Sequence, residues 1–302
     1  MSPIQTEHLN MEAQELSYRD LFNILLKQRW LFLSISALVS ISVLVYSLLL
    51  PDLYQSKALL NPVTDDSNMS SASKTLSSNL VSFAGISLPQ NSSHNSIKAI
   101  DKITTLSFFE ESILPNIFLP DLMAIQSWEK STNTILYDDT IYNSESESWI
   151  SKPSSQSSYK MFKKLLNVSD DKNTGFVSIS IKHQSPYIAQ TWTDLVVREI
   201  NMFFRIKDKA ESQAAMNYLN RQMMQTNFAE IKQVIAQLLQ QKTQRLMLLE
   251  ASEFYVFEYI DPPAAMESKH EPSRLFICII GFIFGIFISA FVVFARYFLN
   301  ND

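Results

Sequence analysis

Two long apolar runs frame the chain. Residues 30–50 and 275–295 each hold 21 positions and no charged side chain. At a rise of about 1.5 Å per residue, a helix of that length spans roughly the 30 Å hydrocarbon layer of a bilayer. The pattern therefore predicts two transmembrane helices. A signal peptide is the alternative for the first run, but its apolar core would be only about 7–15 residues long.

A third stretch, residues 187–260, runs for 74 positions without glycine or proline. These are the two strongest breakers of helices, so their absence favours a long helix. Ser185 and Pro186 suit a helix start, and two prolines from Pro262 onward end the stretch. A helix over about 186–250 would be on the order of 95 Å long. Because no compact domain of this size encloses such a rod, we expect it to protrude.

Apolar residues recur at helical spacing along the middle of this stretch. Asn227 and Lys242 interrupt the stripe, which disfavours a long two-stranded coiled coil and favours looser packing against neighbouring subunits. A helical hairpin within one subunit, with its corner at 217–220, is the alternative. The residues predicted to contact other subunits are Leu219, Met223, Ile231, Val234, Ile235, Leu238, Leu246 and Leu249.

Three short segments have the composition of β-strands. Residues 54–60 and 254–260 are rich in aromatic and aliphatic side chains, and 176–182 alternates apolar and polar positions. Helical spacing recurs over 97–113, whereas eight of the sixteen residues in 143–158 are serine, which is typical of a surface loop. We expect an α+β protein in which two transmembrane helices flank an α/β base domain with a long protruding helix.

The basic residues orient the predicted spans. The first run is preceded by three basic residues, Arg19, Lys27 and Arg29, and followed by Lys57. This difference predicts a cytoplasmic N-terminus. The charges around the second run favour the opposite orientation, but two spans return both termini to one side, and long loops translocate largely regardless of charge. The predicted parts are a cytoplasmic tail (1–29), a span (30–50), a domain outside the cytoplasm (51–274), a second span (275–295) and a second cytoplasmic tail (296–302).

Composition and motifs exclude several function classes. The formal net charge is −5, too small to predict a nucleic-acid partner. The only cysteine, Cys278, lies in the second apolar run, so the chain forms no internal disulfide. The four glycines build no phosphate-binding loop, and the four histidines lack metal-ligand spacing. The sequence thus predicts no catalytic residue, no cofactor and no metal site.

Small residues in the two apolar runs predict a packing face. Gly281, Gly285 and Ser289 follow one another at intervals of four, a spacing that lets helices approach closely in lipid. Ser36 and Ser40 lie on one face of the first run and could receive them. The alternative is that these glycines reflect only the general frequency of glycine in membrane helices.

Several short motifs occur in order around and between the two runs. They are Leu21-Phe22 through Lys27-Gln28-Arg29-Trp30, then Tyr54 to Ala58, then Ser185-Pro186 to Trp192 with Asn201, then Tyr218 to Gln222, and finally Tyr255 to Phe257 leading into Asp261-Pro262. In this order they resemble the bacterial chain-length determinant family, the Wzz-type polysaccharide co-polymerases, in the two-span form without a kinase domain. The resemblance covers most of the chain but is poor over roughly 110–160, and 263–272 departs from the evenly spaced prolines of the family.

The resemblance implies a protein of the bacterial inner membrane that forms rings of identical subunits, with the long helices rising into the periplasm. Such proteins are non-catalytic regulators: they set how many repeat units a membrane glycan polymerase adds to a lipid-linked polysaccharide, for example the O-antigen of lipopolysaccharide. Some relatives carry a cytoplasmic tyrosine kinase. Because seven residues follow the second run and no nucleotide-binding loop is present, we expect that activity to be absent.

Two other function classes remain open at the level of sequence. A membrane receptor or sensor with a periplasmic ligand domain would need a separate signalling partner, because the predicted tails are short. A glycan-modifying enzyme would need a pair of periplasmic carboxylates. Candidates such as Asp138 and Asp139 lie in loop-like sequence, where a solvated surface is the usual explanation.

Overall fold

The computed structural model describes residues 28–63, 92–251 and 254–299. The chain divides into two compact units, residues 1–51 with 271–302, and residues 52–270. Most of the predicted tail 1–29 and the last residues of the tail 296–302 lie outside the described residues. The fold is α+β, as predicted, with apolar helices near both ends and a long helix in the larger unit.

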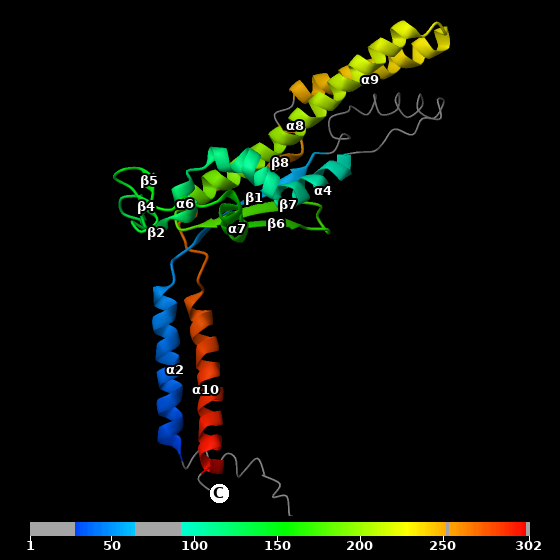
Figure 1. The fold of residues 1–302 in the computed structure, drawn as a ribbon. Helices are drawn as coiled ribbons and strands as arrows, with labels where there is room; N and C mark the ends of the chain where they lie inside the picture. The colour runs from blue at the N-terminus through cyan, green and yellow to red at the C-terminus, as the bar shows by residue number, and fades with distance from the viewer. Residues whose placement is uncertain (1–27, 64–91, 252–253, 300–302) are drawn as a thin grey trace, which may run out of the picture. The chain divides into compact units, whose positions relative to one another are not determined.

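The first unit consists of two packed helices. They are α2 (Arg29–Leu49) and α10 (Arg274–Leu299), which run side by side in Figure 1. Both helices are long and apolar enough to cross a membrane. Their bounds agree with the predicted spans 30–50 and 275–295 to within a few residues.

The second unit contains a four-stranded antiparallel sheet. The strand order is β6 (Leu166–Asp170), β7 (Val177–His183), β1 (Tyr54–Pro62) and β8 (Phe257–Asp261). Three of these strands correspond to predicted strands, and β6 was not predicted. Leu166 and Val168 alternate with Asn167 and Ser169 there, but the pattern is only four residues long, and the strand is held by pairing with β7.

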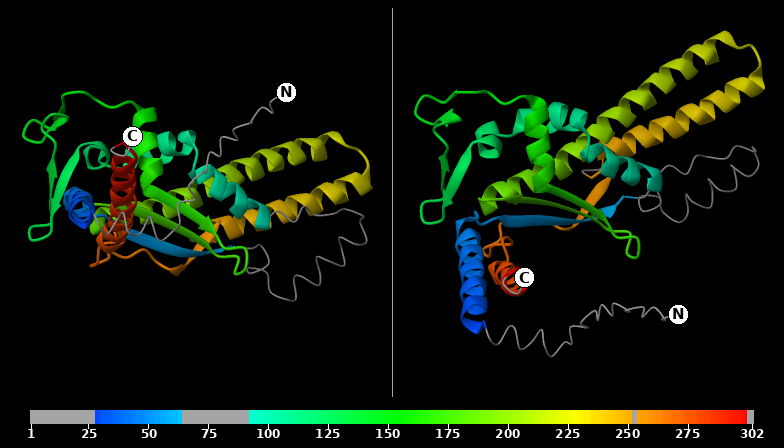
Figure 2. Two further views of the ribbon diagram at one scale, coloured as in Figure 1. Left: turned by 90° about the horizontal axis from the view of Figure 1, so that it is seen from below. Right: turned by 60° about the horizontal axis from the view of Figure 1, so that its bottom comes forward.

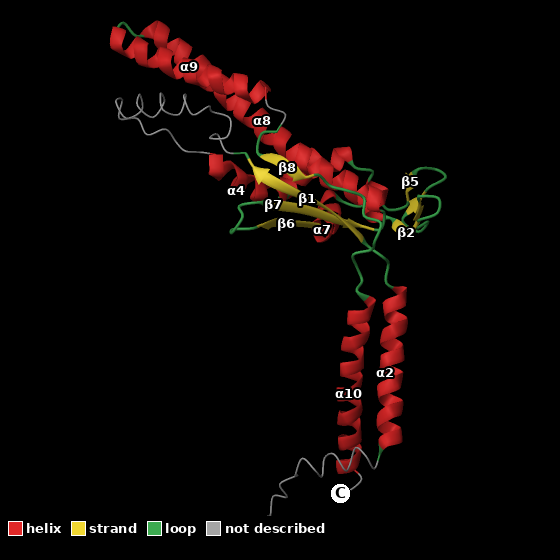
Figure 3. Ribbon diagram, turned by 180° about the vertical axis from the view of Figure 1, so that it is seen from behind, coloured by secondary structure: helices red, strands yellow, loops and turns green. Residues whose placement is uncertain are grey.

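One face of the sheet carries the core. Figure 3 shows the helices that pack beside the sheet, and the first half of the long helix α8 (Pro186–Gln225) lies along it. Alternate residues of β1 and β7 are buried beneath that helix, as the period of two in a strand requires. The core includes Ala58, Leu60, Val177, Ile179, Ile181, Trp192, Val196, Ile200, Phe204 and Phe257.

Short elements between β1 and β7 complete the unit. They are α4 (Ser92–Ile103), α5 (Leu106–Phe108), the π-helix η1 (Phe109–Ile113), the 3₁₀-helix η2 (Leu114–Asn116), α6 (Leu119–Met123), the pair β2 (Ile125–Glu129) and β3 (Thr134–Tyr137), the pair β4 (Tyr142–Asn143) and β5 (Ser148–Trp149), and α7 (Ser155–Leu165). The helical pattern predicted over 97–113 is present but broken at Thr104 and Thr105. The serine-rich segment 143–158 is a loop only in part, because Ser154 caps α7 by accepting a hydrogen bond from the Ser157 N–H.

The prediction of one unbroken helix over 186–250 is wrong. The helix α8 ends at Gln225 after 40 residues, and α9 (Ala229–Ala251) runs back beside it. The break is at Thr226, whose ψ angle of 141° lies outside helical geometry. The return buries Ile235, which a lone rod would expose to water at a cost of about 2 kcal/mol. The hairpin extends beyond the sheet in both views of Figure 2, and its corner lies beyond the 217–220 of the alternative prediction.

Candidate functional surfaces

The small residues of the first unit meet where α2 and α10 pack. A Cβ atom added to Gly285 would lie 3.1 Å from the carbonyl oxygen of Ser36 and 3.4 Å from the Ser40 hydroxyl. One added to Gly281 would lie 2.5 Å from a methyl group of Val43, a distance that real contacts do not reach. The structure therefore brings Gly285 next to Ser36 and Ser40, and leaves no room for a side chain at Gly281.

Serine hydroxyls line the same seam. Ser289 is fully buried and donates to the carbonyl oxygen of Ile286 at 2.9 Å. Ser47 is also buried, and neither its hydroxyl nor that of Ser40 has a hydrogen-bond partner within the part of the chain that the structure describes. The contact between the helices thus depends on close approach of small residues, with little contribution from hydrogen bonds across the seam.

The stripe predicted to contact other subunits is divided by the hairpin. Within one chain Ile235 is buried, and Leu219, Met223, Leu238 and Leu246 are half-buried. Ile231 and Val234 remain 46% and 45% exposed. The side chain of Leu249 lies outside the described residues. Much of the stripe therefore serves contact between α8 and α9, and Ile231 and Val234 are the described members that still face solvent in one subunit.

Sequence reasoning missed two apolar residues at the corner of the hairpin. Met224 and Phe228 are 83% and 67% exposed. They flank the break between α8 and α9, which could not be placed from the pattern alone. At the other end of the hairpin, the Lys209 ammonium lies 2.8 Å from a carboxylate oxygen of Glu250 and lowers the pKa of that carboxyl.

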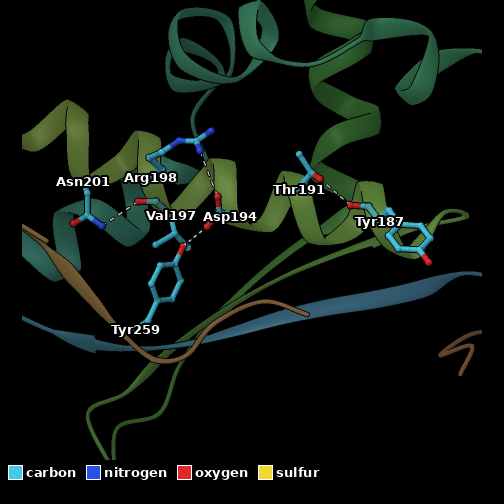
Figure 4. A network of polar contacts seen from close by, with 7 residues as sticks. All are labelled: Tyr187, Thr191, Asp194, Val197, Arg198, Asn201 and Tyr259. Carbon is cyan, nitrogen blue, oxygen red and sulfur yellow. Dashed lines mark hydrogen bonds and ion pairs between the residues drawn. The ribbon is translucent and has the colours of Figure 1, made fainter. Parts of the chain in front are cut away.

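Polar contacts join α8 to the sheet (Figure 4). The Tyr259 hydroxyl donates to Asp194 at 2.9 Å, and Arg198 lies 3.4 Å from the other oxygen of the same carboxylate. Burial, followed by the bond to Asp194, raises the pKa of Tyr259. One turn further along, the Asn201 amide donates to the carbonyl oxygen of Val197 at 3.1 Å. The bond between Tyr259 and Asp194 joins β8 to α8, and the other two contacts lie within the helix.

A buried histidine occupies the end of β7. The Nδ1 atom of His183 accepts the N–H of Ser185 at 3.0 Å, so its Nε2–H donates to the carbonyl oxygen of Asp121 at 2.9 Å. Burial lowers the pKa of His183. The Tyr137 hydroxyl donates to the Asp121 carboxyl at 2.6 Å, and burial raises the pKa of both groups. Both ring nitrogens of His183 have a hydrogen-bond partner, so the cluster has a structural role: it connects β7, α6 and β3.

The two ends of the second unit are tied to each other. The N–H of His270 donates to the carbonyl oxygen of Leu53 at 2.8 Å, and Lys269 lies 3.1 Å from Asp52. Both segments lead directly into the first unit. Among the described residues, no group of three or more histidine, cysteine, aspartate or glutamate side chains could hold a metal ion.

Comparison with known proteins gives one family and two solved structures. The family of the chain length determinant protein, Wzz, matches residues 14–106. A full-length bacterial polysaccharide co-polymerase is similar at 13% identity over 94% of this chain and 99% of its own, with a TM-score of 0.39. A fragment of WzzB, a polysaccharide co-polymerase from Salmonella Typhimurium, is similar at 14% identity over 73% of this chain and 100% of its own, with a TM-score of 0.30. No curated protein sequence matches the chain.

The family match fits the class that the fold defines. Two helices able to cross a membrane, one near each end of the chain, fit a protein of the bacterial inner membrane with one large domain between its spans. The match confirms the resemblance carried by the sequence motifs: over roughly its first third, the chain is similar to the Wzz-type chain length determinants. It covers the first predicted span and β1, and it supports regulation of polysaccharide chain length.

Proposed function

We propose that this protein regulates the length of a lipid-linked polysaccharide, such as the O-antigen of lipopolysaccharide, without catalysing a reaction itself. The observation that carries the proposal is the family match over residues 14–106, together with the two apolar helices. The protein acts as an oligomeric scaffold of the inner membrane that engages the glycan polymerase and biases the point at which extension ends. Catalysis then belongs to the polymerase.

In this proposal residues 52–270 lie in the periplasm and both termini in the cytoplasm. Basic residues before the first helix support the orientation. The tie between Lys269 and Asp52 suits a domain whose two ends return to one membrane surface. Within the bilayer Gly285 packs beside Ser36 and Ser40, and Gly281 packs against Val43, which holds the two spans of each subunit together.

Subunits of the scaffold contact one another through the hairpin. Ile231 and Val234 lie one turn apart on α9, and both are exposed in one chain. Exposed apolar residues at helical spacing suit packing against a helix of another subunit. The buried part of the stripe, with Ile235 at its centre, supports this contact indirectly because it holds the hairpin closed.

Deletion of the gene and analysis of the surface polysaccharide test the function. Loss of the protein should broaden or shift the distribution of glycan lengths on a gel, while the total amount of glycan and its sugar composition stay the same. Restoring the intact chain should restore the distribution. An unchanged ladder in the deletion strain would remove the proposed function, and loss of all polymer would point to a catalytic role.

A further inference from the structure

Four aromatic rings gather in the region that resembles the family least. Phe118 lies 6.0 Å from Tyr142 and 6.3 Å from Tyr137, measured between ring centroids. Tyr142 lies 5.2 Å from Trp149, its partner across β4 and β5. Most of these rings meet edge to face, the arrangement that aromatic quadrupoles favour. We call this set of Phe118, Tyr137, Tyr142 and Trp149 the aromatic platform.

The platform has a buried base and an exposed ring. Tyr142 is only 3% exposed, whereas Phe118 is 52% exposed. Phe118 stands at the N-cap of α6, where its extended backbone carries the ring out of the helix. The Tyr137 hydroxyl is used by Asp121, which fixes the ring beneath Phe118. The exposed ring of Phe118 is therefore supported from one side by the rings of Tyr137 and Tyr142.

Oxygen acceptors are frequent in the segment that carries the platform. Residues 118–151 contain six acidic residues and one lysine. Of these acids, Glu145 and Glu147 are exposed in the turn between β4 and β5, and Asp139 is exposed in the connection between β3 and β4. The segment also carries exposed hydroxyls, including that of Ser148. An exposed ring in a segment rich in exposed carboxylates and hydroxyls suits a ligand that has apolar C–H faces and many O–H donors.

We propose that the aromatic platform is a sugar-binding surface that contacts the polysaccharide whose length the protein regulates. A pyranose ring would lie on Phe118 with its polarised C–H bonds toward the negative face of the aromatic ring. Its hydroxyl groups would donate hydrogen bonds to Glu145, Glu147 or Asp139, and bonds to charged acceptors are the stronger kind. This inference rests on the proposed function for the identity of the glycan.

The charge of the region favours a sugar over other occupants. Six acids against one lysine repel the anionic headgroups of a bilayer. The same excess opposes contact with the identical surface of a second copy. A neutral or amino-bearing sugar meets no such penalty, and its hydroxyl groups satisfy acceptors that lipid chains would leave unpaired.

The β2–β3 hairpin that supplies Tyr137 also contacts the sheet. The ring of Tyr54 on β1 lies 5.4 Å from that of Trp128 on β2, measured between ring centroids. This contact holds the platform on the sheet of the second unit.

Calorimetric titration of the full-length protein in lipid nanodiscs tests the proposal. The probe is the polysaccharide that mild acid releases from the surface of the strain encoding the protein. The intact protein should bind the probe, and Phe118→Leu, which keeps an apolar side chain but removes the ring, should bind about tenfold more weakly. Phe228→Leu is the matched control, because Phe228 is 67% exposed on the α8–α9 hairpin, and it should bind within twofold of the intact protein.

Several outcomes would overturn the sugar-binding surface. The first two are absence of binding by the intact protein and equal binding by Phe118→Leu. Brominated lipid that quenches the tryptophan fluorescence of the intact protein but not of Phe118→Leu would show that the surface contacts lipid. A change of oligomer size in that variant would show that it contacts another subunit. Near-ultraviolet circular dichroism establishes that Phe118→Leu is folded. The proposed function fails separately: an unchanged glycan ladder in the deletion strain with probe binding intact removes the function, whereas a changed ladder without binding removes only this surface.

Discussion

Asn201 bonds both backbone groups of Phe257. Its Nδ2 donates to the carbonyl oxygen of Phe257 at 3.0 Å, and its Oδ1 accepts the N–H of Phe257 at 3.0 Å. The same Oδ1 accepts the N–H of Val256 at 2.7 Å and that of Tyr255 at 3.2 Å. One buried amide on α8 thus positions the whole start of β8, the strand that follows the hairpin.

Replacing Asn201 with alanine should destabilise the second unit by about 2–4 kcal/mol. The substitution leaves several buried backbone groups without a partner, and each costs about 1–3 kcal/mol when the structure does not adjust. Amide hydrogen exchange at 255–257 should accelerate strongly while that of β6 and β7 changes less. Asn217→Ala is the matched control, because Asn217 is exposed on the same helix. Equal exchange in the two variants would contradict the role of Asn201.

Gly281→Leu should separate α2 from α10. A side chain at this position meets Val43 at distances that cannot be accommodated without moving a helix. Gly285 lies beside Ser36 and Ser40, and Gly281 lies beside Val43, so the two helices are antiparallel. Extending this register by one turn brings Cys278 to the level of Ser47. We expect a cysteine introduced by Ser47→Cys to form a disulfide with Cys278 under mild oxidation, and Gly281→Leu to reduce its yield severalfold.

Ala37→Leu provides the control for this substitution. Ala37 is exposed on α2, so the larger side chain should face lipid and leave the disulfide yield unchanged. If Gly281→Leu cross-links as efficiently as the parent protein, the small residues do not determine the distance between the two helices.

The sequence was sufficient for the elements whose patterns are long and regular. The apolar runs 30–50 and 275–295 could be read directly, because nothing but membrane or a large core accommodates 21 uncharged residues. The alternation in 176–182 identified β7 for a similar reason. A packing face between the two apolar helices was expected from the interval between Gly281 and Gly285, and the structure shows that Gly285 lies beside Ser36 and Ser40.

Features that depend on tertiary contact could not be predicted. No glycine or proline marks the break at Thr226, and the chain turns there because Ile235 gains burial when α9 packs on α8. The role of Asn201 depends on β8, which is more than fifty positions away in sequence. The aromatic platform was hidden because Phe118, Tyr142 and Trp149 lie in loop-like sequence and meet only after two short hairpins form.

Substitutions at neighbouring positions of α9 should have different effects on folding and on assembly. Ile235 is 7% exposed and Val234 is 45% exposed. Ile235→Ala should destabilise the hairpin by about 2–4 kcal/mol, because it leaves a cavity between α8 and α9. The double variant Ile231→Ser with Val234→Ser should keep the hairpin, since both side chains face solvent in one chain, but should lower the mass of the oligomer.

Light scattering in mild detergent and circular dichroism distinguish the two effects. The control is Gln233→Ser, at an exposed polar position on the same helix, which should change neither mass nor helix content. If the double variant assembles to the same mass as the parent protein, Ile231 and Val234 do not lie between subunits, and the proposed contact moves elsewhere on the hairpin.

His183 should make the second unit less stable in acid. Burial holds its folded-state pKa below the usual value near 6.5, so the folded protein prefers the neutral ring. The stabilising contribution is therefore present above about pH 6.5 and is lost as the pH falls through the folded-state pKa. Protonation would also place a proton on Nδ1, which accepts the Ser185 N–H.

His183→Gln should have a lower melting temperature at pH 7.5 but a smaller decrease between pH 7.5 and pH 5 than the parent protein. The raised pKa of Asp121 acts in the opposite sense, because its contribution is greatest below the usual range of a carboxyl group and declines as the pH rises. His270→Gln is the control, since His270 is exposed and the substitution should leave the decrease unchanged. A parent protein whose melting temperature is the same at both pH values would show that the His183 ring does not control acid stability.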